Sequence, residues 1–244
     1  MLRVRPVLNT PHAGAWAEML LSLGLAELDY ATAGERCFAA DSGRVVVRTA
    51  PAFAIELGFE VRDLDKFAQW TRSDGTEVLL LPAAGTPGTP DAGLVGQITA
   101  DDQLVFTATP VDAGVTAGSG LEAARAPLGV LAVWNTPDLP GAAQTLRNIG
   151  ARDSPISQGG SGTHFRAKNG GYVDLRASGS AGVELEFGID GDPGELAARL
   201  AAAGRQPRFA AGAHSRILLV PHPDGGDLPI AERHHHADGR AARE

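Results

Sequence analysis

Charged side chains alternate with apolar ones in several segments of this sequence. These charged residues are Arg5, Glu56, Glu60, Asp174, Arg176, Glu184 and Glu186. Residues two apart on a β-strand point to the same face of a sheet, so strands in these segments would bring the charges together. Carboxylates and guanidinium groups on one face can pair with each other, bind a charged small molecule or, with enough donors, hold a metal ion.

The alternation is clearest in the segments 55–61 and 183–189. In the first segment the odd-numbered residues are all apolar, whereas Glu56 and Glu60 have even numbers. The second segment divides in the same way, with Glu184 and Glu186 opposite its apolar side chains. The apolar faces are expected to pack under helices, which leaves the carboxylates on the other face.

These strands belong to a duplicated sequence. Val7-Leu8-Asn9-Thr10-Pro11-His12 returns as Val133-Trp134-Asn135-Thr136-Pro137-Asp138, and the segment 55–61 returns as 183–189. A register kept across half the chain indicates two copies of one folding unit. We therefore predict two domains, 1–112 and 127–233, with a Gly- and Ala-rich linker at 113–126 and a flexible tail at 234–244.

Each copy contains the order strand, helix, strand, strand, strand twice. Apolar residues at helical spacing predict helices at 13–25, 64–71, 139–149 and 195–203. Alternating segments predict the strands between them, including continuous strands at 3–10 and 55–61. The sequence therefore predicts four β-α-β-β-β modules.

Two motifs carry a resemblance to a known family. Asn135-Thr136-Pro137-Asp138-Leu139 is similar to the strand-to-helix corner of the vicinal oxygen chelate superfamily, and Val220-Pro221-His222-Pro223-Asp224-Gly225 is similar to the turn before its last strand. This superfamily includes glyoxalase I, bleomycin-resistance proteins, fosfomycin-resistance enzymes and extradiol dioxygenases. The resemblance covers nearly the whole chain. It implies an α+β fold in which four β-α-β-β-β modules pair into two open-barrel, glyoxalase-like domains.

The resemblance also implies where a metal site would be. In metal-dependent members, the first and last strands of each module contribute one His or Glu each. The corresponding positions here are Arg5, Val46, Glu56 and Phe106, then Leu131, Asp174, Glu184 and Pro229 or Ile230. No pairing of modules joins more than two carboxylates, so we expect no metal and no cofactor. A register error of two residues would bring in Glu60, Glu186 or Glu232, which keeps a metal site as the minority alternative.

In place of a metal site we expect a cleft that binds a ligand. We predict that Arg5 pairs with Glu56 where the family would place a bond between ligand and metal. Tyr172 is expected to share the cleft with Asp174 and Arg176, and Trp134 is expected to face it as well. An acidic cleft and a negative net charge favour a cationic or aromatic molecule. The alternative is that the acidic residues form the solvated face of half-exposed strands.

Other reactive side chains are expected to have structural roles. His164 and His214 have no partner at metal-ligand spacing and are expected at the surface, and His222 is expected to shape its turn. Cys37, the one cysteine, has no base nearby in sequence, which predicts a buried and inert thiol. Trp16 lies at a helical core spacing and is expected to pack.

Composition narrows the classes of function. A formal net charge of −8 argues against nucleic-acid binding, which requires Lys and Arg to neutralise phosphates. No apolar run approaches the ~20 residues of a membrane span, and the N-terminus has no secretory stretch, so we expect no membrane partner and a cytoplasmic location. Because one chain holds both copies, we expect a monomer with pseudo-twofold symmetry, with a homodimer as the alternative.

Three functions stay open from the sequence. The first is a metal-independent protein that binds or sequesters a small-molecule ligand, similar to the bleomycin-resistance branch. The second is a divalent-metal-dependent lyase or dioxygenase of the glyoxalase type. The third is a non-catalytic interaction module whose clefts are vestigial. Catalytic residues are not assigned in any of these interpretations.

Overall fold

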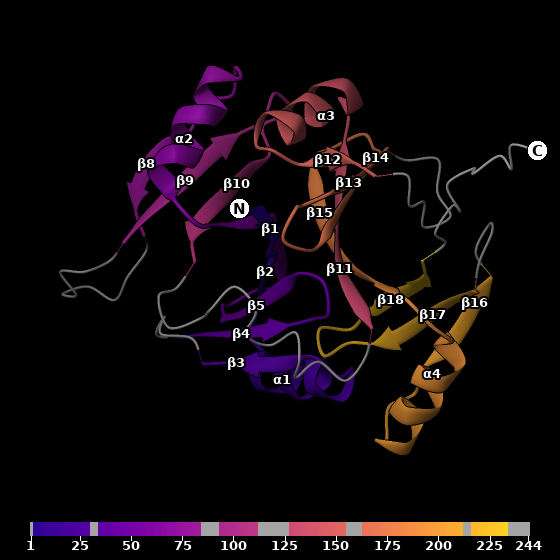
Figure 1. Ribbon diagram of the computed structural model, residues 1–244. Helices are drawn as coiled ribbons and strands as arrows, with labels where there is room; N and C mark the ends of the chain where they lie inside the picture. The colour runs from indigo at the N-terminus through magenta and orange to yellow at the C-terminus, as the bar shows by residue number, and fades with distance from the viewer. Residues whose placement is uncertain are drawn as a thin grey trace, which may run out of the picture.

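The computed structural model describes residues 2–29, 34–83, 93–111, 127–154, 163–211 and 216–233. The predicted linker and tail, and His214, lie outside these ranges. Within them the chain is an α+β protein in which the predicted order strand, helix, strand, strand, strand occurs four times. The helices lie at the periphery and the strands toward the centre (Figure 1).

The first half of the chain, residues 2–111, forms two of these units. The first unit contains β1 (Leu2–Val4), β2 (Val7–Thr10), α1 (Ala13–Ser22), β3 (Ala26–Leu28), β4 (Glu35–Ala39) and β5 (Arg44–Thr49). The second unit contains β6 (Ala54–Glu56), β7 (Gly58–Val61), α2 (Leu64–Ser73), β8 (Leu79–Pro82), β9 (Leu94–Thr99) and β10 (Val105–Pro110).

The second half, residues 127–233, forms the other two units. One contains β11 (Leu128–Thr136), α3 (Leu139–Asn148), β12 (Arg152–Asp153), β13 (Thr163–Arg166) and β14 (Tyr172–Ala177). The other contains β15 (Gly182–Ile189), α4 (Pro193–Ala202), β16 (Arg208–Ala211), β17 (Arg216–Pro221) and β18 (Asp227–Glu232).

The first strand of every unit pairs in parallel with the last strand of the same unit. These pairs are β2 with β5, β7 with β10, β11 with β14 and β15 with β18. The two units of a half then join through their first strands, which pair antiparallel: β11 with β15, and β1 and β2 with β7 and β6. The second half is thus one sheet of eight strands, in the order β12-β13-β14-β11-β15-β18-β17-β16.

In the first half the equivalent strands divide between two five-stranded sheets. The predicted strands 3–10 and 55–61 are interrupted at Arg5-Pro6 and at Leu57. Pro6 has no N–H to donate to a strand ladder, which favours a break there. A β-carbon on Gly58 would lie 2.5 Å from the carbonyl oxygen of Arg5, so the two backbones approach closely at this point. The strand prediction missed this break, although Pro6 signals it.

Each sheet packs one face against helices, and we call the opposite face the inner face. Leu57, Phe59 and Val61 belong to the hydrophobic core, as do Leu185 and Phe187. This confirms the alternation predicted for both segments, because the residues between them then point to the inner face. The charged side chains are therefore carried by the side of the sheet that does not pack on helices.

Aspartate residues cap the N-termini of three of the helices. Asp63 accepts a hydrogen bond from the N–H of Lys66, Asp138 from that of Gly141, and Asp192 from that of Gly194. Such caps satisfy N–H groups that have no partner within the helix. None of the described helices is long and apolar enough to cross a membrane.

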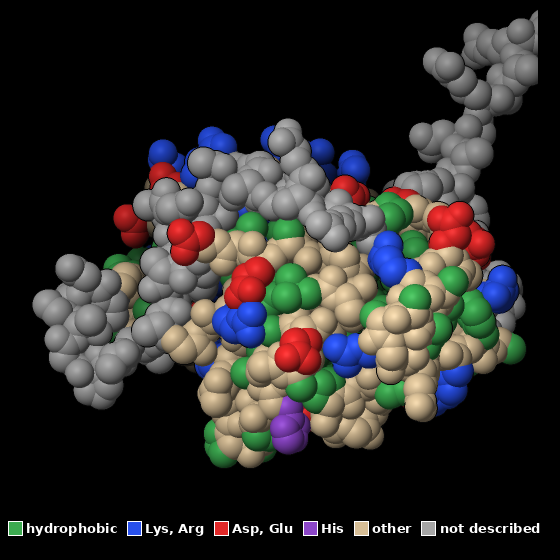
Figure 2. Space-filling model, turned by 90° about the horizontal axis from the view of Figure 1, so that it is seen from below, with side chains coloured by type: hydrophobic (Ala, Val, Ile, Leu, Met, Phe, Trp, Pro, Cys, Tyr) green, Lys and Arg blue, Asp and Glu red, His purple; other side chains and the backbone are tan. Residues whose placement is uncertain are grey.

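Many surface charges belong to ion pairs. Examples are Arg36 with Glu27 and Arg147 with Asp153. Figure 2 shows acidic and basic side chains next to one another on the face seen from below. Exposed pairs of this kind contribute about 0–1 kcal/mol each, so they affect solubility more than stability.

The two halves are joined by their hairpin tips. Ser42, between β4 and β5, donates its N–H to the carbonyl of Leu128 at 3.2 Å, and its carbonyl accepts from the N–H of Val130 at 2.7 Å. Gly170, between β13 and β14, accepts from the N–H of Val4 at 2.9 Å. Each tip thus extends the ladder of the other half's first strand. The tips occupy equivalent positions in the repeat, so each half contributes the same kind of contact to the other.

A second reciprocal contact joins each turn before a last strand to the other half. Trp134 Nε1 donates to Asp102 Oδ2 at 2.8 Å, and Trp16 Nε1 donates to Asp224 Oδ2 at 2.6 Å. Thr10 Oγ1 also donates to Asp224 at 2.8 Å. Both indoles are buried, which confirms that Trp16 packs in the core. Charge-assisted bonds of this kind fix the orientation of one half against the other.

His222 stacks on the aromatic side chains at this junction. Its ring centroid lies 5.0 Å from Trp16 and 5.2 Å from Phe53, and its Nδ1 accepts from the N–H of Asp224 at 3.2 Å. Burial lowers the pKa of His222 below the ordinary value for histidine, although Asp224 and Asp227 act to raise it. The folded state therefore favours the neutral imidazole.

Acidification is expected to destabilise the fold through His222. The unfolded chain binds the proton more readily, so the free energy of unfolding falls as the pH drops below about 6.5 and levels off below the pKa of the folded state. Urea denaturation between pH 5 and 8, for the wild type and for His222→Gln, measures this effect. The stability difference between the two proteins should shrink at low pH, and a difference that is independent of pH would refute the assignment.

Candidate functional site

The inner face of the second half gathers five residues that the sequence suggested. They are Tyr172, Asp174, Arg176, Glu184 and Glu186. Asp174 and Glu184 both lie opposite Val133, on the two sides of β11. Tyr172 and Glu186 flank Leu131 in the same way. The carboxylates are thus placed on either side of an apolar strand.

Arg176 crosses this strand to reach an acid on the other side. Its two terminal nitrogens donate to the two carboxylate oxygens of Glu186, at 2.8 and 3.0 Å. Because Arg176 is on β14 and Glu186 on β15, the bridge passes over the inner face of β11, where Leu131 and Val133 are fully buried. A bidentate pair of this kind fixes the guanidinium in both position and orientation.

Three acids surround this guanidinium group. Burial acts to lower the pKa of Arg176, but its hydrogen bonds with Glu186, and then the charges of Glu186, Asp174 and Glu184, outweigh it and raise the pKa. Arg176 therefore stays protonated and acts as the resident cation of the cluster. These three acids and one guanidinium group sum to a negative charge.

The first half repeats this arrangement in part, because Glu56 is equivalent to Glu184 but Gly58 stands where the second half has Glu186. Asn9 donates to Glu56 at 2.9 Å, as Asn135 donates to Glu184 at 2.8 Å. Arg48, at the position equivalent to Arg176, contacts Glu56 across β2 at 3.5 Å. A guanidinium group therefore reaches over the first strand in both halves. Asn9 and Arg48 were not predicted as site residues, although the repeat places an Asn and an Arg at these positions in each copy.

His164 is buried, so its predicted surface position is wrong. It lies on β13 directly opposite Asp174, and its Nδ1 contacts a carboxylate oxygen of that residue. Only 9% of the His164 surface is exposed, and 4% of that of Asp174. The other ring nitrogen, Nε2, is buried and has no hydrogen-bond partner among the described residues. The sequence missed this pair because its partners are ten residues apart, across a hairpin.

Tyr172 lies on the same face, next to Leu131 of β11. The guanidinium carbon of Arg233 lies 5.2 Å from the centre of the tyrosine ring, and Arg233 also pairs with Asp190. Tyr172 is half-buried, and its ring packs beside Gly129. A tyrosine in this position supplies an aromatic wall and a cation–π partner for the arginine.

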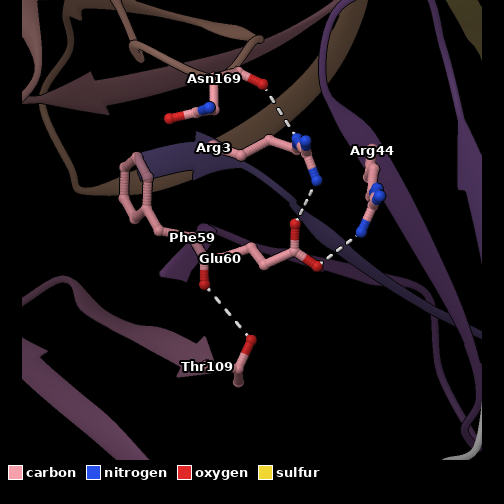
Figure 3. Close-up of polar contacts among 6 residues, drawn as sticks. All are labelled: Arg3, Arg44, Phe59, Glu60, Thr109 and Asn169. Atoms are coloured by element: carbon pink, nitrogen blue, oxygen red, sulfur yellow. Dashed lines mark hydrogen bonds and ion pairs between the residues drawn. The ribbon is translucent and has the colours of Figure 1, made fainter. Parts of the chain in front are cut away.

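A second charged cluster is buried at the junction of the halves. Glu60 receives a hydrogen bond from Arg3 at 2.5 Å and another from Arg44 at 2.7 Å (Figure 3). Arg3 also donates to the carbonyl of Asn169 in the second half at 2.9 Å. Burial, and then the charge of Arg44, lower the pKa of Arg3, and Glu60 opposes both. Glu60 is 1% exposed, so this cluster is a structural contact and no molecule from solution reaches its carboxylate.

The predicted ion pair between Arg5 and Glu56 is not formed. The carboxylate of Glu56 is half exposed and is held by Asn9 and Arg48, whereas Arg5 is buried. The buried acid of this region is Glu60, four residues after Glu56 in the sequence. Cys37 is also buried here, and burial raises the pKa of its thiol to about 11, which confirms the prediction of an inert thiol.

Two further positions differ from the prediction. Trp134 packs edge-on against Phe106, with ring centroids 5.7 Å apart, and is fully buried on the helix side of its strand. Its predicted place on the cleft side is therefore wrong, because Val133 and Asn135 take that face. Phe106 belongs to the same core, so this last-strand position is not on the inner face.

The donor set does not fit the metal that the fold implies. Val46 and Glu56 flank Val7, and Asp174 and Glu184 flank Val133, so each half offers at most two acids around an apolar residue. Asp174 already contacts His164, and Glu186 already binds Arg176. Within the described ranges, no group of three or more His, Cys, Asp or Glu side chains could hold a metal ion.

Known structures share this fold. A halotolerant catechol dioxygenase superposes with a TM-score of 0.60 at 14% identity, over 96% of this chain and 87% of that one. Homoprotocatechuate 2,3-dioxygenase from Arthrobacter globiformis gives 0.60 at 15% identity, over 98% and 81%. A Mn(II)-bound glyoxalase from Novosphingobium aromaticivorans gives 0.57 at 16% identity, over 94% and 80%.

These likenesses show the fold and nothing finer. The sequence matches no protein-family model, and it matches no curated protein. The α+β architecture expected from the resemblance to the vicinal oxygen chelate superfamily is therefore confirmed as a fold. Activity has to be argued from the residues of this chain, because one fold hosts many chemistries.

Proposed function

We propose that this chain is a metal-independent protein, similar to the bleomycin-resistance proteins, that binds or sequesters a small molecule. Its ligand would lie on the inner face of the second half. One observation carries the proposal: Arg176 takes the place between β14 and β15, over β11, that the resemblance assigns to a metal ion. A cation tethered to the chain neutralises Glu186 and removes the need for a metal there.

The domain arrangement that goes with this proposal follows the repeat. We propose domains at 1–112 and 127–233, each with its own inner face. In the first half the charged groups pair with each other: Glu60 is buried with its two arginines, and Arg48 contacts Glu56. In the second half the polar side chains differ in their exposure to solvent. Glu184 is exposed, Arg176 is half-buried and Asp174 is buried. Such convergent polar groups beside apolar residues are typical of ligand sites.

Chelation is expected to leave the protein unchanged. Treatment with EDTA should shift the midpoint of thermal unfolding by less than about 1 °C, because a metal that does not bind the native state contributes no stability. Addition of Mn²⁺ or Zn²⁺ to untagged protein should have the same null effect, and a variant without the histidine triplet His234-His235-His236 of the predicted tail removes adventitious binding there. Recovery of about one equivalent of metal per domain would favour the glyoxalase or dioxygenase alternative instead.

A ligand panel tests the binding function directly. Molecules specific for the native state raise its unfolding temperature by mass action, so thermal shifts against cationic, neutral and anionic aromatic compounds identify the class. We expect at least one saturable hit whose affinity changes in Arg176→Ala and is unchanged in Arg36→Ala, a matched arginine in a surface ion pair. If no compound binds and sedimentation shows association that depends on concentration, the interaction-module alternative replaces this proposal.

A further inference from the structure

On the inner face of the second half, His164 contacts Asp174, and this pair makes no hydrogen bond with the Arg176–Glu186 bridge. A carboxylate only accepts hydrogen bonds, so the contact at Nδ1 requires the proton to be on that nitrogen. In the tautomer whose one proton is on Nδ1, Nε2 is an acceptor. Asp174 thereby fixes both the orientation of the ring and the nitrogen that carries its proton.

This acceptor is buried and has no partner among the residues that the structure describes. The described part of the chain gives Nε2 no hydrogen-bond partner, and 9% of the residue is exposed. Buried polar groups in native proteins nearly always have a partner, and one that lacks a partner calls for a ligand, a water molecule or a catalytic role. A molecule that binds here must bring an N–H or O–H donor.

The surrounding charges select among such donors. Asp174, Glu184 and Glu186 all act on Arg176, so three acids surround one guanidinium group in this cluster. Arg166 lies one row away on β13 and is exposed, and Arg233 is paired with Asp190. A positively charged donor would therefore be attracted, and a carboxylate repelled. Protonated amines and amidinium groups combine the positive charge with the N–H.

We infer that His164, oriented by Asp174, is the hydrogen-bond acceptor for an ammonium or amidinium group of the ligand. This inference rests on the proposed binding function and names the subsite and the ligand class. Solution molecules reach the cluster from Glu184 and Arg176, its exposed and half-exposed members. Nε2 itself is covered, so a neighbouring side chain must move to admit the incoming group.

The test compares three probes that share one aromatic ring: benzylamine, benzyl alcohol and benzoate. Each is titrated into the full chain while long-range ¹H–¹⁵N spectra follow the imidazole nitrogens, with His164 assigned from His164→Gln. Benzylamine should shift the His164 Nε2 signal saturably and bind at least about tenfold more weakly to His164→Gln. His222→Gln is the matched control and should bind benzylamine as the wild type does. Benzoate should leave the His164 signals in place.

Several results would overturn the inference. They are benzoate binding as tightly as benzylamine, a bound amine that leaves His164 unmoved, and no amine binding at all. The proposed function fails separately: a panel hit that stabilises wild type and His164→Gln equally leaves the binding function standing and removes only this subsite. Thermal unfolding of His164→Gln confirms that the variant is folded before its affinity is compared.

Discussion

Replacement of Glu60 by glutamine is expected to lower the free energy of unfolding by about 3–5 kcal/mol. Arg3 and Arg44 share this one carboxylate, and all three side chains are at most 5% exposed. Without its charge, the two guanidinium groups stay buried and repel each other. Burial, and then the charge of Arg44, already lower the pKa of Arg3 while Glu60 is present to oppose them. Urea denaturation of the variant measures the loss.

The matched control for Glu60→Gln is Glu56→Gln, on the preceding strand of the same segment. Glu56 makes an equivalent number of polar contacts, but its side chain is 49% exposed. Water replaces lost contacts at an exposed site, so the control should lose less than about 1 kcal/mol. Equal losses in the two variants would mean that the Glu60 cluster is not a buried ionic contact.

Replacement of Gly171 by alanine is the second change with a large expected effect, a loss of about 3 kcal/mol. Gly171 has φ +84°, in the left-handed region, and a β-carbon there would overlap the Cβ of Val4 and lie 3.1 Å from its Cγ2. Backbone strain contributes about 1–2 kcal/mol and overpacking about 1–3 kcal/mol. Val4 belongs to the strand that the hairpin tip of the second half extends, so the substitution acts directly on the contact between the halves.

Gly150→Ala separates the two contributions. Gly150 has φ +91°, but none of the described atoms lies within 4 Å of the position that a β-carbon would take, so only the backbone strain applies. We expect this control to lose about 1–2 kcal/mol and Gly171→Ala to lose more in the same denaturation experiment. If the two variants are equally stable, the close approach of the hairpin tip to Val4 does not hold in solution.

The fold followed from periodicity and duplication. The alternation in 55–61 and 183–189 placed the apolar side chains on the core side, and the helices begin within two residues of their predicted starts. The strand break at Arg5-Pro6 was missed because the alternation of side chains continues through it. Local patterns of this kind report which face a residue prefers, and they depend only on neighbours along the chain.

The pairing of the charged side chains could not be predicted from the sequence, because the partners lie on different strands. The sequence placed Asp174, Arg176, Glu184 and Glu186 on one face, but it did not pair Arg176 with Glu186 or His164 with Asp174. It also placed Trp134 on the wrong side of its strand, because a large aromatic residue is compatible with either face. Hydrogen-bond partners depend on the register between strands, and registers are set by long-range pairing rather than by local sequence.

The chain by itself thus determined the order of its elements, their duplication and the face that carries the charges. These properties arise from periods of 2 and 3.6 residues that are written directly in the residue types. Only the tertiary structure decided that a guanidinium group spans the first strand in each half. It also decided that a buried imidazole in the second half has one nitrogen on Asp174 and no partner for the other within the described ranges. The physical reason is that ion pairing acts over a few ångströms in space, between side chains that the sheet brings together from separate strands.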